Sequence, residues 1–213
     1  MLNMALITDF PFFLASVVLI SVPLVVTPGP VFAVTIAKGY RSKAAGALIA
    51  LGHGAIEFPL ILLLYFGLSE FLANTIVHKV IGLVGGSIMI YIGFQTLKAR
   101  KEKSEEHQNP KGGYKHSSFA AGLIATAANP YFFISWATIG AALVENAAFF
   151  GFIGLLMFAI THWSCDLLWD TFVSVTVFKS RRFWTQKVFN LVFIVCFAIL
   201  VFFGLWFIVS ALL

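Results

Sequence analysis

The sequence predicts an all-α integral membrane protein with six transmembrane helices, arranged as two three-helix halves of opposite topology. Three observations predict this fold. Hydrophobic residues make up 60% of the 213 residues and charged residues only 11%, which is typical of a chain embedded in lipid. Basic residues gather in alternate loops between the apolar segments. The two halves share a proline break in their first helix and a histidine–acid pair in their second.

Six apolar segments approach or exceed the roughly 20 residues that are needed to cross the hydrocarbon core of a bilayer. They comprise residues 10–36, 44–67, 80–97, 117–143, 149–178 and 188–213. Basic residues follow the first segment and none precedes it, so we interpret it as a membrane helix and not as a removable signal peptide. The chain is then a single membrane domain over 1–213, with one half at 1–97, a cytoplasmic loop at 98–116 and a second half at 117–213.

The positions of the basic residues predict the orientation. Thirteen of the 14 Lys and Arg residues follow the first, third or fifth segment, and only Lys79 lies on the other side. Cytoplasmic loops carry the excess of basic residues in membrane proteins. Both termini are therefore expected outside the cell. The same distribution explains the net charge of +5 without any nucleic-acid partner.

Proline breaks are expected in the first and fourth segments. The first contains Thr27-Pro28-Gly29-Pro30, and the fourth contains Asn129-Pro130. Proline removes a backbone donor and clashes with the preceding helical turn, and freed backbone groups inside a bilayer need protein or a water-filled cavity around them. Matched breaks in halves of opposite topology are typical of secondary transporters, whose substrate sites lie at the interface between the repeats. We expect these six residues to line or shape such a site.

Ionisable residues in the second and fifth segments predict a second part of the site. His53 and Glu57, like His162 and Asp166, are spaced four apart and so lie on one helical face, and Asp170 extends the second series. Ionisable groups inside a membrane usually mark an ion pathway or a proton relay. A buried imidazole and carboxylate can share one proton. The pattern therefore favours proton coupling, although interhelical hydrogen bonds alone would also explain it.

Several of these motifs together resemble the lysine exporter (LysE/RhtB) family. The resemblance rests on the break at residues 27–30, the turn Lys38-Gly39-Tyr40-Arg41, the small residues between Gly46 and Gly52, the sequence Tyr91-Ile92-Gly93, Asn129-Pro130, and an aspartate in the fifth segment that we match to Asp166. It covers nearly the whole chain.

The resemblance implies a six-helix exporter of amino acids or related metabolites in the cytoplasmic membrane of a prokaryote. It further implies that a proton or ion gradient drives export and that the protein can form a homodimer. No cofactor is expected. Family members often lack the His53–Glu57 pair that this chain carries.

Three functions stay open at this point. The first is proton-coupled export of a small amino acid. The second is export of a divalent metal such as Zn²⁺, Ni²⁺ or Mn²⁺, for which His53, Glu57, His162 and Asp166 offer nitrogen and oxygen ligands. The third is a membrane scaffold that transports nothing, in which case no cavity would join the two breaks. Enzymatic activity is not expected, because the chain shows no nucleotide-binding loop, nucleophile elbow or metalloprotease helix.

Overall fold

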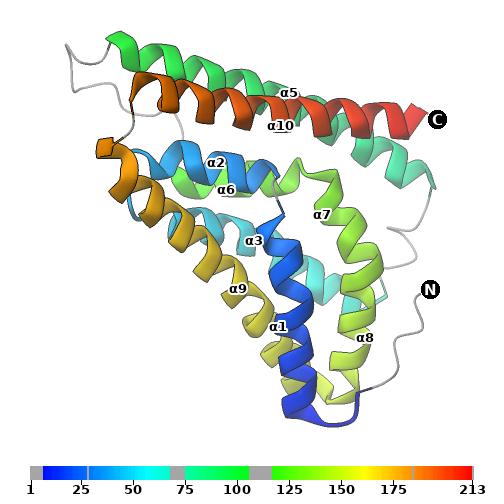
Figure 1. Cartoon of the computed structure of the whole chain (residues 1–213). Helices are drawn as coiled ribbons and strands as arrows, with labels where there is room; N and C mark the ends of the chain where they lie inside the picture. Colours follow the sequence, from blue (N-terminus) through cyan, green and yellow to red (C-terminus); the bar gives the residue numbers. More distant parts are fainter. Residues whose placement is uncertain (1–6, 28, 68–74, 106–116, 184, 213) are drawn as a thin grey trace.

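The computed structural model describes residues 7–27, 29–67, 75–105, 117–183 and 185–212, and the regular structure within these ranges is entirely helical (Figure 1). The helices are α1 (Phe10–Val26), α2 (Pro30–Gly39), α3 (Ala45–Tyr65), α5 (Thr75–Glu105), α6 (Ser118–Ala127), α7 (Pro130–Ser135), the π-helical turn η2 (Trp136–Gly140), α8 (Ala141–Phe149), α9 (Gly151–Ser180), the short 3₁₀ turn η3 (Arg181–Phe183) and α10 (Gln186–Leu212). The helix of the predicted third segment continues past residue 97, because α5 ends only at Glu105.

Both predicted breaks separate helices. The axes of α1 and α2 differ by 70° across the first break, and Pro30 begins α2. The Thr27 hydroxyl donates to the Pro23 carbonyl oxygen at 2.8 Å, which satisfies one group at the end of α1. At the second break α6 ends at Ala127 and α7 begins at Pro130. Pro28 lies outside the described residues.

Within the described ranges, four helical segments are long and apolar enough to cross a membrane, and the bent α1–α2 pair adds a fifth. The four are Ala45–Tyr65, Pro130–Phe149, Gly151–Phe183 and Gln186–Leu212. The apolar part of α5, Gly82–Phe94, and the helix α6 are shorter than a full span. The described residues therefore form an all-helical structure with four or five helical segments that could cross a membrane, and six spans with both termini outside stay a prediction.

Small residues let the helices approach closely at two crossings. A Cβ atom on Gly52 of α3 would clash with the Phe119 carbonyl oxygen of α6, and one on Gly122 of α6 would clash with the Ile49 carbonyl oxygen of α3. Helices α5 and α10 lie side by side and antiparallel (Figure 1), and they cross where Gly86 meets Gly204. Such contacts are how membrane helices gain packing energy without a hydrophobic driving force.

The main apolar core lies between α1, α3, α9 and the α7–α8 segment. Its largest buried side chains include Phe13, Leu60, Trp136 and Phe158. The Trp136 ring meets the Phe158 ring edge-on, with centroids 6.2 Å apart. This core closes one side of the region in which the polar residues gather.

Candidate functional site

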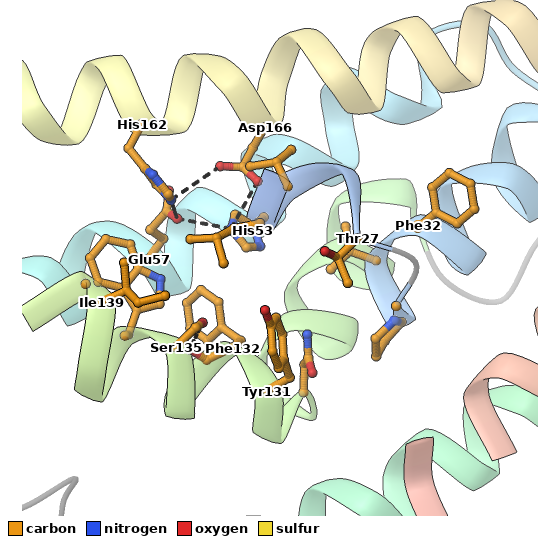
Figure 2. Close-up of a pocket in the computed structure, with 18 of the residues that line it drawn as sticks. Thr27, Phe32, His53, Glu57, Tyr131, Phe132, Ser135, Ile139, His162 and Asp166 are labelled. Carbon is orange, nitrogen blue, oxygen red and sulfur yellow. Dashed lines mark hydrogen bonds and ion pairs between the residues drawn. The ribbon is translucent and has the colours of Figure 1, made fainter. Parts of the chain in front are cut away.

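The two histidine–acid pairs lie together in space. They come from α3 and α9, which pack against each other and face their pairs inward (Figure 2). Glu57 is fully buried, and His53, His162 and Asp166 are each at most 8% exposed. The helical spacing seen in the sequence thus produces one buried cluster, which we call the His–acid cluster: His53, Glu57, His162 and Asp166.

Glu57 is the centre of this cluster. Its Oε1 atom lies 3.2 Å from Nε2 of His53 and 3.2 Å from Nε2 of His162. Asp166 is farther away, with Oδ1 at 3.8 Å from His53 Nε2 and Oδ2 at 3.9 Å from His162 Nε2. Each histidine therefore faces one carboxylate from its own helix and one from the other helix. Glu57 Oε2 and Asp166 Oδ2 are buried without a hydrogen-bond partner.

The other nitrogen of each histidine contacts a hydroxyl group. His162 Nδ1 lies 2.6 Å from Ser21 Oγ on α1, and His53 Nδ1 lies 2.8 Å from Thr126 Oγ1 on α6. Each histidine is thus held by a hydroxyl from the other half of the chain. Our sequence reasoning missed Ser21 and Thr126. Single Ser and Thr residues are common in membrane helices, and nothing in their spacing relates them to the histidines.

Asp170 lies apart from the hydrogen bonds of the His–acid cluster. It is 3% exposed and accepts a hydrogen bond of 3.0 Å from the Thr35 hydroxyl on α2. One turn farther along α9, the Ser174 hydroxyl donates to the Lys43 carbonyl oxygen at 3.0 Å. The predicted polar series on α9 therefore continues one helical turn beyond Asp170, to Ser174.

A cavity of about 180 Å³ joins the cluster to both helix breaks (Figure 2). Its walls include Thr27, Gly29 and Pro30 from the first break, Asn129 from the second, and the whole His–acid cluster together with Asp170. Thr27 and Tyr131 are exposed, whereas the cluster is buried, so the cavity leads inward from the surface of the molecule. Pro130 is buried beside it and is not among its lining residues.

Polar groups at the breaks are available to a ligand. Gly29 and Asn129 are the N-cap residues of α2 and α7, and neither helix start has a side-chain cap. The Oδ1 atom of Asn129 is buried and has no hydrogen-bond partner. Buried polar atoms are nearly always paired in proteins, so an unpaired one that lines a cavity marks a position for a ligand or water. None of the described lining residues is Lys or Arg.

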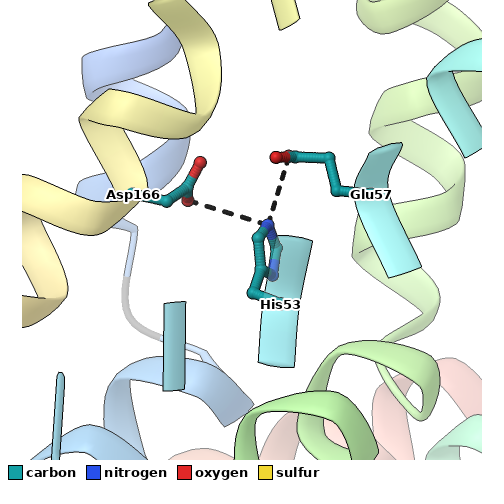
Figure 3. Close-up of side chains that lie close together, drawn as sticks. All are labelled: His53, Glu57 and Asp166. Carbon is teal, nitrogen blue, oxygen red and sulfur yellow. Dashed lines mark hydrogen bonds and ion pairs between the residues drawn. The ribbon is translucent and has the colours of Figure 1, made fainter. Parts of the chain in front are cut away.

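Three members of the cluster are also close enough to hold a metal ion together. One ligand atom each from His53, Glu57 and Asp166 can be chosen so that all lie within 4.8 Å of one another (Figure 3). Nitrogen and oxygen ligands of this kind suit Zn²⁺, Ni²⁺ and related ions. The geometry alone therefore accommodates either a proton or a metal ion.

Comparison with known proteins agrees with this architecture. The sequence profile of the LysE type translocator family matches residues 22–211. A putative amino acid efflux protein of Bacillus subtilis (strain 168) is 29% identical over 161 residues, which is 75% of this chain and 77% of that protein. No solved structure matches significantly. Because the family profile covers nearly the whole chain, this protein belongs to the family of LysE type translocators.

Proposed function

We propose that this chain exports a small amino acid across the cytoplasmic membrane of a prokaryote in exchange for protons. The observation that carries the proposal is the cavity that joins two broken helices to a buried His–acid cluster. The similarity to a putative amino acid efflux protein supports the class of substrate. The basic loops support six spans with both termini outside, arranged as an inverted repeat.

The size of the cavity and the residues that line it support a zwitterion as its ligand. At about 180 Å³ the cavity is smaller than the roughly 300–1,000 Å³ of pockets for drug-sized ligands, so a small metabolite fits it better. A substrate ammonium group would face the carboxylates, and the carboxylate would approach the uncapped start of α2 at Gly29 and the amide of Asn129. Apolar walls such as Phe32 and Phe132 would take the side chain.

The cavity also supports transport over a scaffold that transports nothing. A scaffold would need the polar residues only as internal hydrogen bonds between helices. Instead the cavity reaches both breaks, and Glu57 Oε2, Asp166 Oδ2 and Asn129 Oδ1 have no partner. These unpaired oxygens would destabilise a protein that never binds a ligand there.

Asp166→Asn is expected to abolish gradient-driven export while the protein stays folded. The substitution keeps the volume of the side chain but removes the charge that faces both histidines at 3.8 and 3.9 Å. Efflux of each of the twenty ¹⁴C-labelled amino acids is measured in proteoliposomes with an imposed pH gradient. Wild-type rates in the Asp166→Asn protein would overturn the role of this residue, and no flux of any amino acid in the wild type would overturn the proposed function.

Export of a divalent metal is the second candidate, because His53, Glu57 and Asp166 lie within reach of one ion. We expect Zn²⁺, Ni²⁺ and Mn²⁺ to leave the melting temperature unchanged, since Nε2 of both histidines already lies 3.2 Å from the same Glu57 oxygen and leaves no room for an ion between them. A metal at 1,000 times its Kd would stabilise the folded protein by about 4 kcal/mol. A rise in melting temperature that disappears in His53→Gln would therefore favour the metal function.

A further inference from the structure

The hydroxyl group of Ser21 determines where His162 carries a proton. Ser21 Oγ lies 2.6 Å from the Val17 carbonyl oxygen and 2.6 Å from His162 Nδ1. A carbonyl oxygen only accepts hydrogen bonds, so the single hydroxyl hydrogen points to Val17. Ser21 must then accept from His162, and Nδ1 of His162 carries a hydrogen.

A hydrogen on Nδ1 of His162 limits what the other ring nitrogen, Nε2, can do. A neutral imidazole with its hydrogen on Nδ1 has only a lone pair on Nε2. That lone pair faces Glu57 Oε1 at 3.2 Å. Two acceptors at this distance repel each other unless a proton lies between them. The pair is therefore stable only when His162 is an imidazolium or Glu57 is protonated.

His53 is not constrained in the same way. Within the part of the chain that the structure describes, the Thr126 hydroxyl contacts His53 Nδ1 at 2.8 Å and has no second hydrogen-bond partner. It can donate to that nitrogen, so a neutral His53 can carry its hydrogen on Nε2 and donate to Glu57 at 3.2 Å. His53 thus satisfies Glu57 without any added proton. The two histidines look alike in sequence but differ in the hydroxyl behind them.

The titratable groups that face His162 all belong to α3 and α9. They are His53 and Glu57 from α3 and Asp166 from α9, while Asp170 lies one turn farther along α9 and lines the same cavity. Helices α1 and α6, which supply Ser21 and Thr126, contain no titratable residue. The Trp136 ring covers the imidazole of His162 edge-on, with centroids 5.1 Å apart. No other described helix brings a charged side chain to this position.

We propose that Ser21 is a positioning residue that makes protonation obligatory, and that His162 and not His53 takes up the coupling proton. The inference rests on the proposed proton-coupled export. On uptake, a proton from one side of the membrane forms the Nε2–H bond of His162 and gives an imidazolium paired with the Glu57 carboxylate. That bond breaks when the proton leaves to the other side, and no other covalent bond changes.

Ser21→Ala is expected to uncouple transport and not to stop it. Without the acceptor on Nδ1, a neutral His162 can move its hydrogen to Nε2 and donate to Glu57 with no proton added. Flux of an equimolar ¹⁴C-labelled mixture of the twenty amino acids in proteoliposomes should then persist, while the ratio of protons to amino acids falls by at least twofold. Ser21→Thr keeps the hydroxyl and should restore coupling.

Ser16→Ala is the matched control for this experiment. Ser16 lies on the same helix, and its hydroxyl donates to the Phe13 carbonyl oxygen at 2.7 Å. It lines no part of the cavity. Unchanged coupling in Ser21→Ala, or equal uncoupling in Ser16→Ala, would overturn the role of Ser21.

The position of the hydrogen can be measured without any substrate. Ring ¹⁵N chemical shifts of the purified protein in nanodiscs, assigned by comparison with His162→Gln, report which nitrogen is protonated. We expect Nδ1 of His162 to carry a hydrogen at about pH 6 and at about pH 9, on both sides of the usual histidine range. A neutral His162 with its hydrogen on Nε2 would overturn the inference, even if the chain exports amino acids with protons. Conversely, a protein with Nδ1 protonated that moves no amino acid would contradict the proposed function and leave the hydrogen-bond assignment standing.

Discussion

Glu57→Gln is expected to lower gradient-driven transport by roughly 10²-fold or more. Glu57 is fully buried, and its Oε1 atom lies 3.2 Å from Nε2 of both histidines. Glutamine has the same shape but no negative charge, so it cannot stabilise an imidazolium at His162. An imidazolium at His162 without its carboxylate is an unpaired buried charge, which costs about 3–5 kcal/mol. This cost falls on the protonated state that transport requires, and each 1.4 kcal/mol lowers the population of that state about tenfold.

The measurement is the initial rate of amino acid efflux from proteoliposomes, with and without a pH gradient. Glu145→Gln is the matched control, because Glu145 is an exposed carboxylate on α8 that lines no part of the cavity. The control should transport at the wild-type rate. If Glu57→Gln retains most of the gradient-driven rate, Glu57 does not hold the coupling proton in place, and the His–acid cluster needs another interpretation.

Local sequence patterns were sufficient to predict the helix breaks. Pro28-Gly29-Pro30 and Asn129-Pro130 act within a single turn, so their effect does not depend on distant contacts. Isolated prolines were harder to interpret. Pro23 and Pro59 lie inside the continuous helices α1 and α3, where neighbouring helices and side chains can satisfy the freed carbonyl groups.

The number of spans was harder to predict, because it depends on how far each helix runs between breaks. The predicted fourth segment divides into the short helix α6 and the longer α7–α8 segment. In α5 the polar ends belong to the same helix as the apolar centre, so its boundaries do not follow hydropathy.

The His–acid cluster could be predicted only in part. Four-residue spacing placed each histidine beside its own acid, but the contact between His162 and Glu57 depends on how α3 crosses α9. The same holds for Ser21 and Thr126, which reach the cluster from α1 and α6. These hydroxyls determine which histidine needs a proton, and only the three-dimensional arrangement identifies them.

Gly52→Ala is expected to lower the melting temperature by about 2–12 °C, because α3 and α6 touch through their backbones at this position. The new methyl group would clash with the Phe119 carbonyl oxygen and lie 2.8 Å from the Leu123 backbone nitrogen. Neither atom belongs to a flexible side chain, so the helices must separate. Overpacking of this kind costs about 1–3 kcal/mol, and each kcal/mol shifts the midpoint by about 2–4 °C in a protein of this size.

Ala55→Val tests whether added volume alone destabilises the helix. Ala55 is exposed on the same helix, so this control should melt like the wild type. Separation of α3 from α6 would also carry His53 away from Thr126, to which it is hydrogen-bonded at 2.8 Å. Gly52→Ala should therefore lose stability and transport together, whereas Glu57→Gln should lose transport while α3 and α6 stay packed. Equal melting temperatures for Gly52→Ala and the wild type would show that the two helices are not in backbone contact at this crossing.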